Sequence, residues 1–247
     1  MNNLGCVQKK LPCLFQVQVL DAPSDKRHSQ PYKVIATPDF EEEAFKHDIH
    51  SARLSEKLDG TCVYVAKFLG KPWLWARLDR RPNKATERRL KKFLADHRTL
   101  QRHGEKSETE AEFQWDLPKD LKEVPATWIP ALAVPVVDDI PQPDTCGHIP
   151  GWVPVDRTSR QHCWHLGAVD LDNSLGLVMR EDDCYHGDLI IEARPLEELE
   201  GHTAELIGTH INGNPYGIGN KQCPIHLLVI HGIMGIMNAP RSKPPCY

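Results

Sequence analysis

The chain has 247 residues, of which 40% are hydrophobic and 26% are charged, and this composition is typical of a globular protein with one large or two small domains. The formal net charge of -4 excludes a histone-like polycation, so any contact with nucleic acid has to come from a local basic patch. The longest apolar stretch, Leu227 to Met237, is too short to span a bilayer, and the first ten residues lack the apolar core of a signal peptide. We therefore expect a cytosolic or nuclear protein with no membrane contact. We also expect its eight cysteines to be reduced thiols rather than a disulfide framework.

The first third of the chain is rich in strand signals. Four segments combine β-branched and aromatic residues with partial alternation: Leu14 to Leu20, Tyr32 to Ala36, Thr61 to Leu69, and Pro72 to Leu78. Between the last two, Gly70-Lys71 predicts a tight turn, and hence an antiparallel hairpin. The pattern then changes to helical spacing. Asn83 is a suitable N-cap, and the apolar residues that follow it predict one long helix: Leu90, Phe93, Leu94 and Leu100.

The middle of the chain predicts little regular structure. Residues 103 to 127 are charged and aperiodic, and residues 128 to 155 contain six prolines, which favours a loop-rich connection or insertion. Strand-like segments then resume, separated by Gly, Asn and Asp: CWHLGAV, SLGLVMRE, DLIIEARPL, AELIGTHI and HLLVIHG. The whole pattern predicts an α+β fold of mostly antiparallel sheets with one or two peripheral helices.

Lys57 stands just before the predicted hairpin, followed by Leu58, Asp59 and Gly60. A lysine is a covalent nucleophile only when neutral, and at the usual pKa of about 10.4 fewer than about one in a thousand is neutral at pH 7. A nearby cation such as Mg²⁺, or partial burial, lowers that pKa. The Asp-Gly pair suits a turn that brings the backbone close to a ligand. Taken alone, the four residues favour a solvated lysine before an ordinary Asp-Gly turn.

This arrangement of a lysine, any residue, Asp and Gly resembles the first motif of the covalent nucleotidyltransferases, which include DNA ligases, RNA ligases and capping enzymes. In that superfamily the lysine attacks the α-phosphate of a nucleoside triphosphate and becomes a lysyl-nucleotide. Arg77 matches a basic residue that meets the nucleotide or the nucleic-acid end. Glu205, in AELIGTHINGNPYGIG, is similar to the third-motif acid that approaches the ribose or the metal. The resemblance implies a nucleotide site formed by Lys57, Arg77 and Glu205, with Lys57 catalytic.

A closer resemblance rests on five strings: EKLDGTCVYV, LWARLDRRPNK, GHIPGWVPV, CWH and ELIGTHINGNPYG. Together they look like the ATP-dependent RNA ligase of animals that joins 5′-phosphate and 3′-hydroxyl RNA ends. The resemblance implies a nucleotidyltransferase-like (ATP-grasp-like ligase) domain over residues 1–232, followed by an irregular tail over residues 233–247. It also implies ATP, Mg²⁺ or Mn²⁺, an RNA partner with those ends, and three steps. These are adenylylation of Lys57, transfer of AMP to the 5′-phosphate, and attack by the 3′-hydroxyl with release of AMP.

The sequence departs from that family after Gly232. A fourth motif with an acid and a fifth with a lysine are not found in the remaining residues. The acid would help to hold the metal or its water shell, and the lysine would stabilise charge on the α-phosphate. The expectation is therefore a C-terminally incomplete domain that seals RNA slowly. The alternative is a catalytically inactive RNA-binding or regulatory relative.

Three further features leave alternatives open. Residues 80 to 102 contain nine Arg or Lys against Glu87 and Asp96, which fits either a solvated helix face or an RNA-backbone track. Four Cys–His pairs have the ligand types of zinc but not the usual spacing of structural sites; they begin at Cys146, Cys163, Cys184 and Cys223. Four tryptophans are either core residues or base-stacking platforms: Trp73, Trp75, Trp152 and Trp164.

Overall fold

The computed structural model describes residues 4–7, 13–24, 31–46, 58–102, 112–182, 184–185 and 188–231, with the backbone alone for residues 43 and 97–102. The chain forms two compact units, one made of residues 1–7 and 57–237 and the other of residues 8–56 and 238–247. The predicted boundary at residue 232 stays a prediction, because the residues that follow it lie outside the described part.

The smaller unit is a two-stranded antiparallel sheet of β1 (Phe15–Leu20) and β2 (Lys33–Phe40), followed by a 3₁₀ turn, η1 (Glu42–Lys46). The Phe15 and Phe40 rings stack with their centroids 4.9 Å apart. Both strands were predicted from their alternation, and the structure confirms them.

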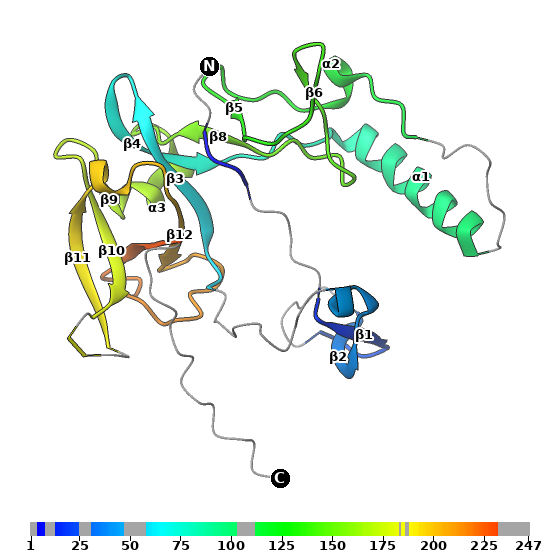
Figure 1. Ribbon diagram of the computed structural model, residues 1–247, viewed down its shortest axis with the longest axis horizontal. Helices are drawn as coiled ribbons and strands as arrows, with labels where there is room; N and C mark the ends of the chain where they lie inside the picture. The colour runs from blue at the N-terminus through cyan, green and yellow to red at the C-terminus, as the bar shows by residue number, and fades with distance from the viewer. Residues whose placement is uncertain are drawn as a thin grey trace, which may run out of the picture. The chain divides into compact units, whose positions relative to one another are not determined.

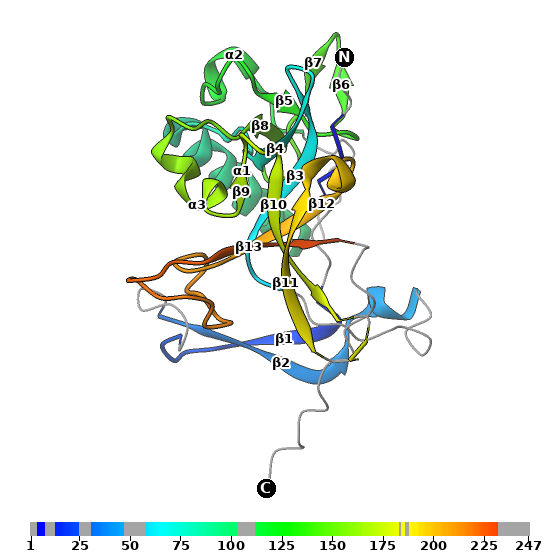
Figure 2. The same cartoon turned by 90° about the vertical axis from the view of Figure 1, so that its left-hand side faces the viewer.

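The larger unit contains a nine-stranded sheet, in which the order is β11-β10-β13-β12-β3-β4-β8-β5 and β9 pairs with β10 (Figures 1 and 2). Its strands are β3 (Thr61–Phe68), β4 (Lys71–Arg77), β5 (Ile129–Pro130), β8 (Gly151–Pro154), β9 (Val169–Asp170), β10 (Leu175–Glu181), β11 (Leu189–Pro195), β12 (Thr203–Gly208) and β13 (His226–Ile230). The one parallel pair among the described strands is β10 with β13. A separate small pair joins β6 (Val136–Val137) to β7 (Ile140–Pro141).

The helices are few. They are α1 (Lys84–Arg102), α2 (Leu117–Asp120) and α3 (Cys163–Leu166), with the 3₁₀ turns η2 (Arg160–His162) and η3 (Leu196–Leu199). The predicted cap is confirmed, since the Asn83 side-chain oxygen accepts the backbone N–H groups of Ala85 and Thr86, each at 3.0 Å. None of the helices in the described residues is long and apolar enough to cross a membrane. The few helices and the mostly antiparallel strand pairs confirm the predicted α+β fold.

Successive side chains of a strand point to opposite faces of the sheet. Both faces of the large sheet carry clusters of apolar side chains. One face carries the main core, which includes Val63, Leu74, Leu206 and Leu228. The other face carries two separate clusters. The aromatic cluster consists of buried Leu4, Tyr64, Ala66, Trp75, Ala131 and Trp152. The aliphatic cluster consists of buried Met179, Ile207, Leu227 and Val229.

Two sequence predictions were wrong. The proline-rich region does contain a strand of the main sheet, because β8 is buried throughout and pairs with β4 and β5. Burial of Trp152 and Val153 on opposite faces outweighs the proline signals that favoured a loop. The segment CWHLGAV was expected as a strand, but its first four residues form α3, which buries the His165 side chain and leaves Trp164 39% exposed. Tertiary packing here overrides a short alternating pattern.

The β3–β4 hairpin is confirmed, with its turn one residue earlier than expected. The two turn residues are Leu69 and Gly70, and both have positive φ, at 50° and 80°. Positive φ at both central residues is the geometry of a two-residue turn whose twist matches the strands.

Candidate functional site

A row of side chains crosses four neighbouring strands on the face that carries the two smaller clusters. Glu205 of β12 lies opposite Cys62 of β3, and Arg77 of β4 lies opposite Trp152 of β8. Val63 pairs with Ala76, so the next position along the β3–β4 pair brings Cys62 beside Arg77. Directly opposed residues in antiparallel strands share a face. We call Glu205, Cys62 and Arg77 the polar row.

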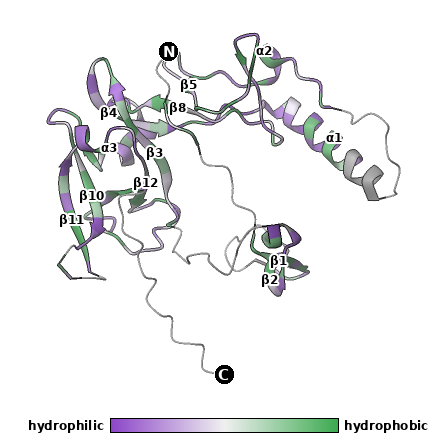
Figure 3. Cartoon of the chain, viewed as in Figure 1, coloured by the Kyte–Doolittle hydropathy of each residue, from purple (hydrophilic) through white to green (hydrophobic). Residues whose placement is uncertain are grey.

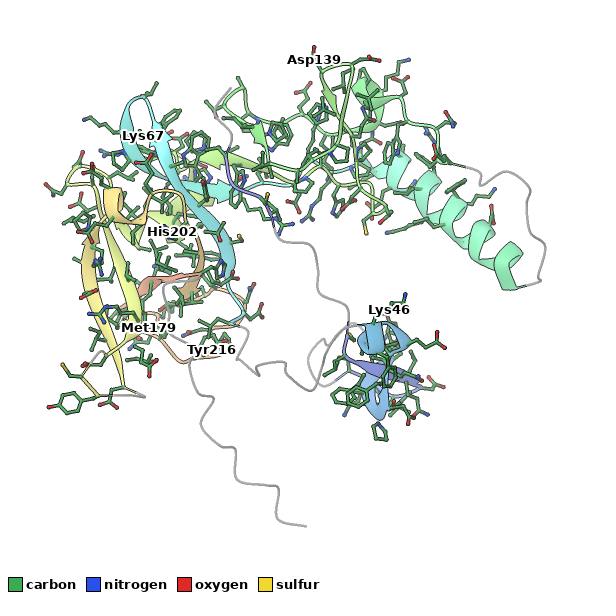
Figure 4. The ribbon with its side chains drawn as sticks, in the orientation of Figure 1. Lys46, Lys67, Asp139, Met179, His202 and Tyr216 are labelled. Carbon is green, nitrogen blue, oxygen red and sulfur yellow. The ribbon has the colours of Figure 1, made fainter. Side chains whose placement is uncertain are left out.

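The polar row lies between the two apolar clusters. Ile207 and Val229 of the aliphatic cluster belong to β12 and β13, on the Glu205 side. Trp75 and Trp152 of the aromatic cluster belong to β4 and β8, on the Arg77 side. Met179, which is labelled in Figure 4, also belongs to the aliphatic cluster. A few polar groups set among apolar side chains are the usual composition of a small-molecule site.

Glu205 is the acid of the polar row, and its side chain is 15% exposed. Its Oε1 accepts the backbone N–H of Gly60 at 2.9 Å, and its Oε2 lies 3.8 Å from Nε2 of His231. A carboxylate that accepts a backbone N–H is held in one orientation by a charge-assisted hydrogen bond. Glu205 therefore fixes the Asp59–Gly60 turn against β12.

The Asp59–Gly60 turn is held from a second direction by the loop between β12 and β13. Asn212 donates its side-chain N–H to the Gly60 carbonyl at 2.6 Å and to Oδ1 of Asp59 at 3.2 Å. The Tyr216 hydroxyl, on a side chain labelled in Figure 4, accepts the Asp59 N–H at 3.1 Å. Leu58 packs against the aliphatic cluster. The chain that directly follows Lys57 is thus fixed by hydrogen bonds and by apolar contact.

Gly60 is the residue that this close approach requires. A Cβ added there would lie 2.3 Å from the carbonyl oxygen of Leu206 and 2.8 Å from Cγ of Glu205. Glycine lets the turn lie directly on the β12 backbone, which no larger residue allows without movement.

The loop that supplies Asn212 and Tyr216 owes its shape to residues that tolerate positive φ. His210, Asn212 and Asn214 have φ of 66°, 44° and 51°, and glycine and asparagine are the residues that best adopt this conformation. The Thr209 hydroxyl donates to the Ile218 carbonyl at 2.8 Å and closes the loop. Sequence reasoning missed Asn212 and Tyr216 as site residues. Their local signal was only a turn-rich string, and they reach the site through tertiary contacts.

Arg77 makes a bidentate ion pair with Asp79, from Nε to Oδ1 at 2.8 Å and from Nη2 to Oδ2 at 2.9 Å. The hydrogen bond to Asp79 is the main cause of a raised pKa of Arg77, and burial opposes it. Burial, with a smaller contribution from the Glu205 charge, raises the pKa of the Cys62 thiol to about 11. At neutral pH the polar row therefore contains the neutral Cys62 thiol between Glu205 and Arg77.

The sequence predicted Lys57, Arg77 and Glu205 as one site. The structure brings Arg77 and Glu205 onto one face, two strands apart. Lys57 lies outside the described residues. The roles assigned to the three residues stay predictions.

Two alternatives from the sequence concern a zinc site and tryptophans that stack on bases. Among the described residues, no group of three or more His, Cys, Asp or Glu is placed to hold a metal ion. Trp75 and Trp152 are buried, with 2% and 0% exposure, and belong to the core. Trp73 is partly buried, and its indole N–H donates to the Val155 carbonyl at 2.9 Å.

Comparison with known proteins decides the family. The family model for RNA ligase 1 matches residues 1–244. The chain belongs to the RNA ligase 1 family. It is 47% identical over 243 residues to RNA ligase 1 of Rattus norvegicus, a match that covers 98% of this chain and 72% of that protein. The RNA ligase 1 proteins of Mus musculus and Danio rerio are 47% and 44% identical, and the matches cover 71% of each of them. The resemblance drawn from the sequence to an animal RNA ligase is confirmed.

Proposed function

We propose that this member of the RNA ligase 1 family is an ATP-dependent RNA ligase that joins 5′-phosphate and 3′-hydroxyl ends through a lysyl-adenylate at Lys57. The observation that carries the proposal is the clamp on Asp59 and Gly60. The two residues that follow Lys57-Leu58 are bonded to Glu205 and Asn212 at the polar row. A nucleophile next to a rigid turn is positioned in advance, which reduces the entropy lost in reaching the transition state.

In the first step, Lys57 loses a proton and its Nζ attacks the α-phosphorus of ATP, so that a phosphoramidate bond forms and pyrophosphate leaves. In the second, a 5′-phosphate oxygen of the RNA attacks the same phosphorus and lysine is released. In the third, the 3′-hydroxyl attacks the activated 5′-phosphate, loses its proton and displaces AMP. Each step is a displacement at a phosphorus whose oxygens carry negative charge, so positioned positive charge is the main stabilising factor.

In this proposal Arg77 contacts phosphate oxygens and Glu205 contacts the ribose or the metal ion. Arg77 is the cation of the polar row, with a side chain that is 34% exposed and paired with Asp79, and its guanidinium would donate hydrogen bonds to phosphate oxygens. Glu205 would approach the ribose or the divalent ion. Mg²⁺ or Mn²⁺ would screen the phosphate charges when bound. One protein carboxylate fits Mg²⁺, because this ion is usually held by one or two carboxylates together with phosphates and several waters.

The test is covalent labelling with ATP that carries the label on its α-phosphate, in the presence of Mg²⁺. We expect the wild-type chain to retain label after denaturation and Lys57→Ala to lose it. Lys57→Arg keeps the charge without the nucleophile and is the matched control, so it should also stay unlabelled. Label retained in Lys57→Ala would overturn the proposal.

Glu205→Gln tests the second role. The amide keeps an oxygen acceptor for the Gly60 N–H but lacks the charge. We expect labelling that needs more ATP or more Mg²⁺, with the fold intact. Unchanged dependence on both would show that Glu205 acts only in packing the turn.

Chasing the labelled protein with a 5′-phosphate RNA separates the proposal from its alternative. Passage of label to RNA supports the ligase, whereas RNA binding without any adenylate favours the inactive RNA-binding relative. The slow sealing expected from the sequence stays a prediction, and sealing rates in the same assay measure it.

A further inference from the structure

The exposed side of α1 carries a line of cations. Lys84, Arg88 and Lys92 are all exposed and follow one another at four-residue spacing, which places them on one side of the helix about 6 Å apart along its axis. We call these three residues the basic row. Residues 80–102 hold nine Lys or Arg and two acids, in a chain whose net charge is -4. Positive charge is therefore concentrated on α1 and the four residues before it.

The charges of the basic row are not neutralised within the described part of the chain, because none of the three residues forms an ion pair there. Of the two acids of the helix, Glu87 is bonded to Lys91, from Nζ to Oε1 at 2.6 Å, and Asp96 stands four residues after Lys92, where the basic row ends. Arg89 differs from the basic row, because its guanidinium contacts both carboxylate oxygens of Asp120 at 3.2 Å. One basic position of the helix thus serves the fold, and the basic row does not.

The basic row also opposes helix stability. Like charges spaced four residues apart repel, and Lys84 occupies the first residue of the helix, where the macrodipole is positive. A row that weakens its own helix needs another explanation, and a polyanionic partner supplies one by charge complementarity.

The start of α1 is held by hydrogen bonds to Asp120 at the end of α2. Asn83 caps α1, and its backbone N–H donates to the Asp120 carbonyl at 2.9 Å. Thr86 donates its hydroxyl to Asp120 at 2.9 Å. Only six residues separate Arg77 at the end of β4 from Lys84 at the start of α1. Figure 1 shows a connecting segment between β4 and α1, and α1 running away from the sheet, and Figure 3 shows hydrophilic and hydrophobic residues interleaved along its described part.

We propose that the basic row binds the phosphate backbone of the substrate RNA and leads one RNA end to the polar row. This inference deepens the proposed function and rests on it for the identity of the partner as RNA. Lysine and arginine contacts to phosphates carry no sequence information directly, so the binding is expected to be independent of sequence and strongly dependent on salt.

The experiment uses the full 247-residue chain and a fluorescein-labelled single-stranded RNA with a 5′-phosphate. The test variant combines Lys84→Gln, Arg88→Gln and Lys92→Gln, because glutamine keeps helix propensity close to that of lysine and arginine. The control variant combines Lys67→Gln, Lys71→Gln and Arg160→Gln. These are exposed cations outside α1, and the control loses the same charge. Lys67 is labelled on the β3–β4 hairpin in Figure 4.

Fluorescence anisotropy is measured between about 50 and 300 mM salt. Each lost phosphate contact reduces the slope of log affinity against log salt by about 0.7 for single strands, so the test variant should lose about 2 from the slope. Its affinity at 0.1 M salt should fall about tenfold to a hundredfold. The control variant should keep the wild-type slope. The melting temperature of the test variant should stay unchanged or rise, since the like charges are gone.

Labelling of Lys57 with ATP separates this inference from the proposed function, because the first step does not need RNA. The test variant should form the adenylate as the wild type does. If RNA affinity falls while neither protein forms an adenylate, the basic row binds RNA and the proposed chemistry is wrong. If the test variant keeps the wild-type affinity and slope, the inference is overturned, whatever the labelling shows. The row is then a solvated helix face.

Discussion

Gly60→Ala is the substitution that tests the clamp on the Asp59–Gly60 turn most directly. The new Cβ would lie 2.3 Å from the Leu206 carbonyl oxygen, where contacts under 3.0 Å are essentially not seen. The obstacle is the β12 backbone, which does not rotate away, so the turn has to retreat by about 1 Å to reach ordinary contact distance. The hydrogen bond from the Gly60 N–H to Glu205, now 2.9 Å, would then lengthen beyond a useful distance.

The expected losses follow from that displacement. A lost hydrogen bond to a charged group and the strain of overpacking together cost about 3 kcal/mol of unfolding free energy. A misplacement of about 1 Å beside a reacting group costs about a hundredfold in rate. We expect the initial rate of Lys57 adenylylation to fall by that factor at saturating ATP, measured on protein shown to be folded by urea denaturation.

Gly70→Ala is the matched control. Gly70 has a φ of +80° and nothing within 4 Å of an added Cβ, so alanine there costs about 1 kcal/mol of backbone strain and touches no part of the site. It should label at nearly the wild-type rate. A Gly60→Ala protein that labels at the wild-type rate, with an unchanged urea midpoint, would refute the reasoning about the clamp.

Three further predictions concern stability. Burial lowers the pKa of His165 to about 4, and neither of its ring nitrogens has a hydrogen-bond partner in the described part of the chain. Because the folded pKa lies below the unfolded value of about 6.5, up to about 3 kcal/mol of stability present above pH 6.5 is lost as the pH falls towards 4. His165→Phe should flatten that dependence in urea titrations at pH 7 and 4.5. Cys62, whose pKa is raised to about 11 mainly by burial, works in the opposite direction. The contribution of the Cys62 thiol to the free energy of unfolding is complete below pH 9, and about 2 to 3 kcal/mol of it is lost as the pH rises towards 11. A Cys62→Ala protein should therefore lose less stability between pH 9 and pH 11. Asp120→Asn places an amide against the donors of Thr86 and Arg89, now at 2.9 and 3.2 Å, and should cost about 3 kcal/mol. Asp116→Asn, on the same short segment, should cost far less, and equal costs would contradict the assigned role of Asp120.

The local elements of this protein could be predicted from its sequence. Alternation located β3, β4, β10, β11, β12 and β13, and an asparagine cap with apolar residues at helical spacing located α1. These signals work because side-chain period and capping chemistry act over a few residues. The Lys-x-Asp-Gly string belongs to the same class, since it is short and contiguous. It marked the segment that the structure then shows clamped at Leu58, Asp59 and Gly60.

The arrangement of the site depended on long-range pairing, which no local pattern records. Gly60 and Glu205 are bonded across 145 residues, and Asp59 meets Asn212 across 153. The register of β12 on β3 decides that Glu205 and Cys62 share a face, and a slip of one residue would turn Glu205 into the main core. The same kind of pairing made a buried strand of Gly151–Pro154 despite its prolines. The chain therefore carries its chemical groups in short motifs, while hydrophobic burial across the sheet decides which of them meet.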